Sequence, residues 1–168
     1  MKSEIYWING PWPGRLAIMP RPRGGDWLDD EIKSWKMEGV EVVVSLLDEE
    51  EVEELDLAGE PEIISQAGMD FVAFPIRDRE VPESRRATQE LLRKLESHLT
   101  DGRRVAVHCR AGIGRSAMIG AALLALSGMD VHTAFKVIAE ARGCPVPDTN
   151  EQKKWVERFS QENAAPTQ

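Results

Sequence analysis

The sequence predicts an α/β fold in which a central, mostly parallel sheet of four to five strands is flanked by helices. Three observations support this prediction. Short apolar runs of strand length alternate with longer segments whose apolar residues recur at helical spacing. Glycine and proline residues separate many of these segments. The run at 40–47 is almost wholly apolar, as expected for a parallel strand that helices cover on both faces.

Five segments have the length and composition of strands. They lie at residues 5–8, 16–19, 40–47, 70–75 and 104–107. The first two flank a turn rich in proline and glycine. Helical patterns separate the later strands, and such connections predict parallel neighbours in one sheet.

The segments between and after these strands have helical patterns. We expect Asp26 to cap a helix that places Trp27 and Trp35 on its buried face and ends at Gly39. An acidic helix follows the third strand. Further helices are predicted at 61–67, 84–99, 117–126, 130–141 and 149–159.

Residues 108–116 connect the strand at 104–107 to the helix at 117–126. A loop in this position can point several backbone N–H groups at one anion, with help from the positive end of the helix dipole. Glycines within the loop let the backbone curl where a Cβ would obstruct it. We therefore predict a phosphate-binding loop formed by Cys109, Arg110, Ala111, Gly112, Ile113, Gly114 and Arg115.

Four side chains in this segment predict chemistry beyond binding. The Cys109 thiol faces N–H dipoles that favour the thiolate, which can attack phosphorus in line. The planar Arg115 guanidinium can hold two equatorial oxygens and offset charge in the transition state. Ser116 can donate a hydrogen bond to the sulfur and help it leave. We expect His108 to orient the loop through backbone hydrogen bonds.

This stretch, His-Cys-Arg-Ala-Gly-Ile-Gly-Arg-Ser, resembles the signature of the cysteine-dependent protein tyrosine phosphatases, especially the compact dual-specificity branch. The resemblance implies a protein tyrosine phosphatase-like fold. It also implies a phosphomonoester hydrolase that forms a phosphocysteine intermediate and needs neither a metal nor a cofactor.

A leaving oxygen needs a proton, so such an enzyme needs a carboxylic acid near its cysteine. The loop at 75–82 follows a predicted strand, and its Asp78 lies 31 residues before Cys109. This arrangement resembles the general-acid loop of the dual-specificity family. Glu80 is a competing candidate for the acid. The alternative is that Asp78 only pairs with Arg77 or Arg79 at the surface.

The second half-reaction needs a water molecule placed against the phosphocysteine. The segment 142–152 resembles the family segment whose Thr-x-x-Gln places a glutamine beside that water, here Thr149 and Gln152. It departs from the family in having Asp148 where an apolar residue is commoner. Simple helix capping by Asp148 or Thr149, with Gln152 in solvent, is the alternative.

The resemblance leaves the substrate open. A short chain has little room for the insert that deepens the cleft of tyrosine-specific relatives, so we expect phosphotyrosine, phosphoserine and phosphothreonine as substrates. A phosphoinositide or another small phosphorylated metabolite is the alternative substrate. An adaptor that binds phosphate without turnover, a pseudophosphatase, is the alternative of another class.

The charge of the chain is unevenly distributed. The net charge of −8 argues against nucleic acid as a general partner. Residues 47–62 hold nine acidic residues and no lysine or arginine, and we interpret this run as a solvated helix face. The remainder is close to neutral, so we expect a locally positive mouth of the site, formed by Arg77, Arg79, Arg110 and Arg115.

The length of 168 residues suits one domain. We expect residues 1–163 to form the catalytic domain and 164–168 to be a flexible tail. No segment is long and apolar enough to span a membrane, and no apolar signal stretch begins the chain. Two cysteines give no disulfide framework, which predicts a cytoplasmic protein. Cys144 is an inert cysteine or a redox partner of Cys109.

Overall fold

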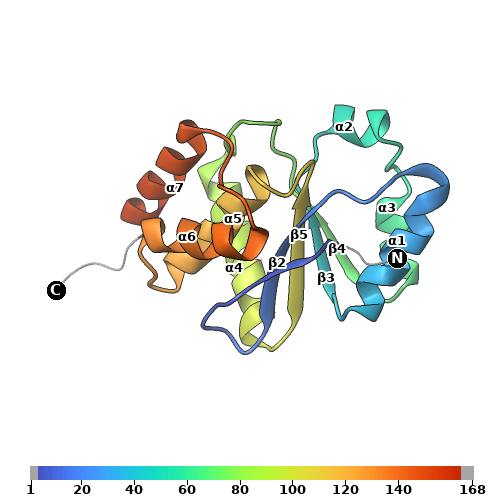
Figure 1. Cartoon of the computed structure of the whole chain (residues 1–168), viewed down its shortest axis with the longest axis horizontal. Helices are drawn as coiled ribbons and strands as arrows, with labels where there is room; N and C mark the ends of the chain where they lie inside the picture. The colour runs from blue at the N-terminus through green and yellow to red at the C-terminus, as the bar shows by residue number, and fades with distance from the viewer. Residues whose placement is uncertain (1–3, 164–168) are drawn as a thin grey trace.

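The computed structural model describes residues 4–163 (Figure 1). Its strands are β1 (Tyr6–Ile8), β2 (Arg15–Pro20), β3 (Val42–Ser45), β4 (Asp70–Ala73) and β5 (Arg104–Cys109). After a 3₁₀ turn at Gly25–Trp27, its α-helices are α1 (Leu28–Met37), α2 (Glu49–Glu54), α3 (Glu60–Gln66), α4 (Arg85–Thr100), α5 (Arg115–Leu126), α6 (Val131–Arg142) and α7 (Asn150–Glu162). The expected tail at 164–168 lies outside the described residues. None of the helices within 4–163 could cross a membrane.

The five strands form one sheet in the order β1-β2-β5-β3-β4. β1 pairs antiparallel with β2, and every other pair is parallel. β5 is the central strand, and Val105 lies opposite Leu16 of β2 and Val42 of β3. The predicted α/β fold with a mostly parallel sheet is confirmed.

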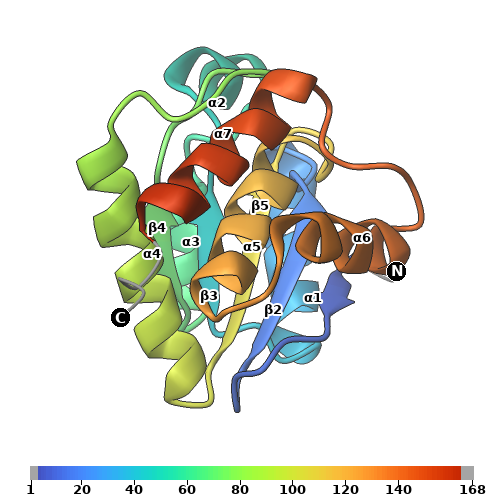
Figure 2. The same cartoon turned by 90° about the vertical axis from the view of Figure 1, so that its left-hand side faces the viewer.

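Helices cover both faces of the sheet (Figures 1 and 2). Alternate strand residues point to opposite faces, so Leu16 and Ile18 pack in one core while Ala17 and Met19 pack in the other. The larger core lies under α4, α5, α6 and α7, and the smaller one lies under α1 and α3. These two layers bury β5 completely from Val105 to Cys109, so its end is held on all sides.

Most predicted elements are present, with different limits. β5 runs on to Cys109, and α5 begins at Arg115, so the connecting loop is shorter than the sequence indicates. β3 is shorter than the apolar run at 40–47. The helices predicted at 130–141 and 149–159 are capped by their first predicted residues, because the Asp130 and Thr149 side chains each accept a hydrogen bond from a backbone N–H of the helix.

The start of the first helix was predicted wrongly. Asp26 lies inside the 3₁₀ turn and does not cap α1, whose cap position is taken by Trp27 without a side-chain hydrogen bond. The tighter turn rotates Trp27 off the buried face, so this side chain is 53% exposed while Trp35 is buried. The Arg23 guanidinium lies 4.4 Å from the centre of the exposed Trp27 ring.

A buried polar pair lies under the carboxyl end of β5. The His108 Nε2 and the Glu60 Oε2 are 2.6 Å apart, and both side chains are almost fully buried. Glu60 is the first residue of α3, and the Trp35 ring of α1 lies 5.9 Å from the imidazole. Because His108 directly precedes Cys109, this contact anchors the strand end at which the following loop begins.

Replacing Glu60 by alanine is expected to lower the free energy of unfolding by about 1–3 kcal/mol, because the buried imidazole loses its hydrogen-bond partner. Urea denaturation measures the change. Glu62→Ala is the matched control, since Glu62 lies on the exposed side of the same helix and its loss should change stability by less than about 0.5 kcal/mol. Equal losses in both variants would contradict a structural role for the pair.

Candidate active site

Cys109 is the last residue of β5 and lies at the carboxyl edge of the sheet, where ligand sites of parallel α/β folds occur. Its side chain is only 2% exposed and forms no disulfide. Residues 110–114 then turn the chain directly into α5. The sulfur therefore lies at the base of a loop that opens onto the start of a helix, as the sequence predicts.

The backbone of this loop has free donors. The N–H groups of Ala111, Gly112, Ile113 and Gly114 donate to no acceptor within residues 4–163. Arg142, at the end of α6, binds the carbonyl groups of the same loop. Its Nε donates to the Gly112 carbonyl at 3.1 Å and its Nη2 donates to the Ala111 carbonyl at 3.2 Å.

A trans peptide points its C=O and N–H in opposite directions. The two carbonyls held by Arg142 therefore turn the N–H groups of Gly112 and Ile113 away from that side chain. Arg142 is itself held, because its guanidinium lies 4.3 Å from the centre of the Tyr6 ring of β1. Arg142 was not among the predicted site residues, although it holds two carbonyls of the loop.

Two glycines let the loop pass close to its neighbours. Gly112 has a φ of +71°, and a Cβ at this position would lie 2.6 Å from the backbone carbon of Met19. A Cβ on Gly114 would clash with the Asp148 carboxylate and come within 3.1 Å of the Gln152 Oε1. The loop thus packs against the end of β2 on one side and the start of α7 on the other.

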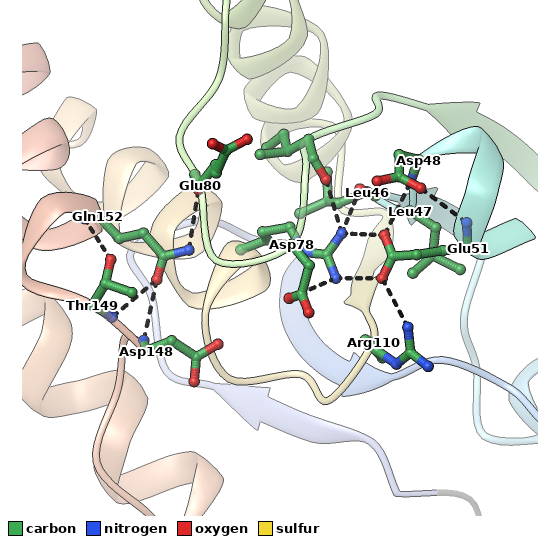
Figure 3. A network of polar contacts seen from close by, with 12 residues as sticks. Leu46, Leu47, Asp48, Glu51, Asp78, Glu80, Arg110, Asp148, Thr149 and Gln152 are labelled. Carbon is green, nitrogen blue, oxygen red and sulfur yellow. Dashed lines mark hydrogen bonds and ion pairs between the residues drawn. The ribbon is translucent and has the colours of Figure 1, made fainter.

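The Arg115 side chain is buried and almost fully engaged (Figure 3). Its two terminal nitrogens form a bidentate pair with the Glu51 carboxylate, at 2.6 and 2.8 Å. Nη1 also donates to the Ile76 carbonyl at 2.8 Å, and Nη2 donates to Asp78 Oδ1 at 3.2 Å. This network joins the start of α5, the start of α2 and the loop that follows β4.

Glu51 is placed by the cap of α2. The Asp48 carboxylate accepts a hydrogen bond from the Glu51 backbone, and the Glu51 carboxylate accepts one from the Asp48 backbone. Burial disfavours the ionised Glu51 carboxyl, but the hydrogen bonds from Arg115 and Asp48 and the charges of Arg115 and Arg110 outweigh it and lower the Glu51 pKa. Glu51 is therefore a buried carboxylate at neutral pH.

The same balance acts on the arginine. Burial alone disfavours the charged guanidinium, but the hydrogen bonds that Arg115 donates to Glu51 and the charges of Cys109, Glu51 and Asp78 outweigh it and raise the Arg115 pKa. The acidic run was interpreted as a solvated helix face. That holds for most of it, but Glu51 and Glu60 are buried and pair with Arg115 and His108.

The loop after β4 places the two candidate acids differently. Asp78 contacts Arg115, while the Glu80 carboxylate points away from this network (Figure 3). Glu80 contributes its backbone carbonyl, which accepts a hydrogen bond from Gln152 Nε2 at 3.1 Å. The predicted surface pairing of Asp78 with Arg77 or Arg79 is not formed. Of the two candidates, only Asp78 directs its carboxylate to the loop arginine.

Gln152 is buried and does not lie in solvent. Thr149 caps α7, and Gln152 completes a capping box in which its Oε1 accepts hydrogen bonds from the backbones of Asp148 and Thr149. Gln152 therefore takes part in the cap and also lies near the loop, since its Oε1 is beside Gly114. Both ends of the Gln152 amide are engaged in this structure.

The remaining predicted residues differ in how they are placed. The Ser116 hydroxyl is buried but has no hydrogen-bond partner within residues 4–163, so the expected bond to the Cys109 sulfur is not formed. Cys144 is half-buried and free. The backbone carbonyl of His108 accepts a hydrogen bond from Leu46 N–H, and its ring Nδ1 has no hydrogen-bond partner within residues 4–163, so no hydrogen bond from His108 to the loop is formed. No group of metal-binding side chains is found within 4–163.

Of the four arginines expected to make the mouth of the site locally positive, Arg110 and Arg115 are paired with carboxylates, whereas Arg77 and Arg79 form no ion pair within residues 4–163. Arg115 is neutralised by Glu51 and Asp78, and Arg110 lies 3.5 Å from Glu54 and 3.8 Å from Glu51. Arg77 lies among carboxylates in a neighbouring cleft. The sequence does not reveal that these acids lie near the arginines, because the acids and the loop are far apart along the chain.

The lowered pKa of Glu51 predicts a pH dependence of stability. A carboxyl whose pKa is lower in the folded state stabilises the fold above its unfolded value, 4.5, and loses this contribution as the pH falls through the folded pKa. We expect Glu51→Gln to be less stable than wild type at pH 7, and the two urea midpoints to converge as the pH falls below 4.5. Glu54→Gln, on the exposed side of α2, should parallel wild type. A constant gap between Glu51→Gln and wild type would contradict the assignment.

Comparisons with known proteins agree with this geometry. Residues 17–129 match the family model Tc-R-P, described as a polymorphic toxin system DSP-PTPase phosphatase. Protein 197R of Invertebrate iridescent virus 6, which is named as a tyrosine phosphatase, is 38% identical over 73 residues. The match covers 42% of this chain and 27% of that relative, so the chain spans only about a quarter of the relative's length.

Two solved structures have the same fold. A kinase associated phosphatase with its catalytic cysteine replaced by serine superposes with a TM-score of 0.88 at 19% identity, over 99% of both chains. PTPMT1 in complex with PI(5)P superposes with a TM-score of 0.75 at 20% identity, over 94% of this chain and 96% of that one. The family model covers well over half of the sequence, and the chain therefore belongs to the Tc-R-P family of DSP-PTPase phosphatases.

Proposed function

We propose that this protein is a metal-independent dual-specificity phosphatase that hydrolyses phosphomonoesters through a phosphocysteine at Cys109. One observation carries the proposal. Arg115 joins the loop above Cys109 to Asp78, so that a nucleophile, free N–H donors, a fixed guanidinium and a carboxyl group meet at one edge of the sheet. Family membership supports the same reaction.

In the first step the Cys109 thiolate attacks phosphorus and forms an S–P bond. The P–O bond to the leaving group breaks, and Asp78 gives its proton to the leaving oxygen. The loop N–H groups and Arg115 hold the three equatorial oxygens as charge develops on them. Arg115 is held in place by Glu51, and its contact with Asp78 is the one to be exchanged when the substrate binds.

In the second step water attacks the phosphocysteine. The Asp78 carboxylate takes a proton from this water, the S–P bond breaks, and inorganic phosphate leaves. The buried Ser116 hydroxyl is free to donate to the departing thiolate. Gln152 is close enough to the loop to orient the water, and it must exchange one of its present partners to do so.

The substrates we propose are phosphotyrosine and phosphoserine or phosphothreonine in proteins. The second candidate is a phosphoinositide or another small phosphorylated metabolite, which the fold shared with PTPMT1 bound to PI(5)P favours. A pseudophosphatase would bind phosphate without turnover, although Cys109, Arg115 and Asp78 are all present. A reducing compartment such as the cytoplasm would keep the free Cys109 thiol active, and we propose that location.

Hydrolysis of an aryl phosphate in excess chelator tests the reaction itself. Wild type should turn over at the same rate with and without chelator, and Cys109→Ser should have no detectable activity because serine is a far weaker nucleophile. Acid quenching during turnover should trap a phosphoryl group on Cys109, detected by mass spectrometry. Loss of activity on chelation would overturn the metal-independent mechanism, and binding of phosphate without turnover would favour the adaptor.

Replacement of each candidate acid tests the role of Asp78. Asp78→Asn should lower kcat by roughly 10²–10⁴ on phenyl phosphate, whose leaving group needs a proton, and by less on a nitrophenyl phosphate. Glu80→Gln is the matched control and should retain nearly full activity, because its carboxylate points away from the site. The reverse result would transfer the role of general acid to Glu80.

A further inference from the structure

An open cleft of about 840 Å³ lies directly beside the loop and carries a strong negative charge. We call it the acidic cleft. It is lined by Asp48, Glu49, Glu50, Pro75, Arg77, Asp78, Glu80 and Glu83. Six of these residues are acidic and one is basic, which leaves an excess of five formal negative charges. Its two walls are the start of α2 and the loop after β4, which lie side by side at the carboxyl edge of the sheet (Figures 1 and 2).

Most of this charge is not compensated by the protein. Among the lining acids only Asp78 has an ion pair within residues 4–163, and its partner is Arg115. Glu49, Glu50 and Glu83 are exposed and form no ion pair within residues 4–163. Arg77 is the one basic residue of the lining, and Arg110 is paired with Glu51 and Glu54 outside the cleft.

The cleft and the catalytic loop share Asp78. This side chain lines the cleft, and its carboxylate also accepts a hydrogen bond from Arg115. A general acid must lie within hydrogen-bond reach of the leaving oxygen. The part of the substrate that carries this oxygen must therefore lie next to the acidic cleft while its phosphoryl group occupies the loop, where the buried Ser116 hydroxyl and the loop N–H groups are unpartnered.

From this geometry we propose that the acidic cleft selects phosphorylated protein segments that carry lysine or arginine beside the phosphorylated residue. The inference rests on the proposed function, because it needs a phosphoryl group held in the loop. Basic side chains would compensate the free carboxylates, whereas acidic neighbours would be repelled. A phosphoinositide in an anionic membrane surface would bring further negative charge against the same wall.

Matched phosphopeptides test this selection. They share one phosphorylated residue and differ only in having two lysines, two alanines or two glutamates beside it. We expect kcat/KM to fall in that order, with about a tenfold or larger difference between the first and the last. The preference should weaken as salt is raised, because the carboxylates are exposed. Aryl phosphate, which carries no charged flanking residue, reports the basal reaction.

A double variant locates the preference. Glu50→Gln/Glu83→Gln removes two cleft charges outside the proposed catalytic machinery and should reduce the lysine preference several-fold, with aryl phosphate hydrolysis unchanged. The control, Glu38→Gln/Asp101→Asn, removes the same charge from exposed residues that precede β3 and β5, at the opposite edge of the sheet. It should leave the preference intact.

The outcomes separate this inference from the proposed function. Equal rates on all three peptides would overturn the inference, and so would faster turnover of phosphoinositide in anionic vesicles than of the lysine peptide. In either case, hydrolysis of aryl phosphate would still support the proposed phosphatase function. If wild type does not turn over aryl phosphate, the proposed function fails. The affinities of the same three peptides for Cys109→Ser would then still measure the charge preference of the cleft. Equal binding of the unphosphorylated lysine peptide would show that the cleft does not act with the loop, which also contradicts the inference.

Discussion

The bidentate pair between Arg115 and Glu51 is the contact on which the site depends. A guanidinium that is 1% exposed must be paired and hydrogen-bonded, or it would destabilise the fold. Meeting that need draws together three segments that are far apart in the sequence: the start of α5, the capped start of α2 and the loop after β4. The buried charge thus brings together the same three segments that the proposed phosphate binding and proton transfer require. Stability and chemistry therefore use the same contacts, and a change in Glu51 acts on both.

The sequence predicts well what is local. The strand, loop and helix around Cys109 are contiguous, and caps such as Asp130 and Thr149 act within one helical turn, so their patterns are visible without a structure. The limits of elements are less visible. Trp27 fits the helical pattern of α1, but a short 3₁₀ turn precedes the helix and rotates this side chain into solvent. Periodicity assumes one regular helix and fails where the helix type changes.

Long-range pairing is what the sequence could not reveal. Glu51 and Glu60 belong to a run of acids that looks uniform, and nothing local separates them from their exposed neighbours Glu50 and Glu62. Each is selected by a partner more than forty residues away, Arg115 for one and His108 for the other. The capping pattern of Asp48 and Glu51 could have indicated a helix start, but not its contact with the loop. The pairing of Arg110 and Arg115 was missed for the same reason, because Glu51 and Glu54 of this run reach these two arginines of the expected positive mouth.

The distribution of charge has a consequence for how such a site would recognise phosphate. With Arg110 and Arg115 paired, attraction over long distances is weak, and binding depends on short contacts: loop N–H groups, the helix dipole and the fixed guanidinium. Asp78 occupies one donor of Arg115 in the free protein. A phosphate dianion that enters the loop competes with Asp78 for this donor and would release the carboxyl group. In the proposed reaction the released Asp78 carboxylate would take up a proton from water before it protonates the leaving oxygen, so one ion pair would link the arrival of the substrate to the readiness of the acid.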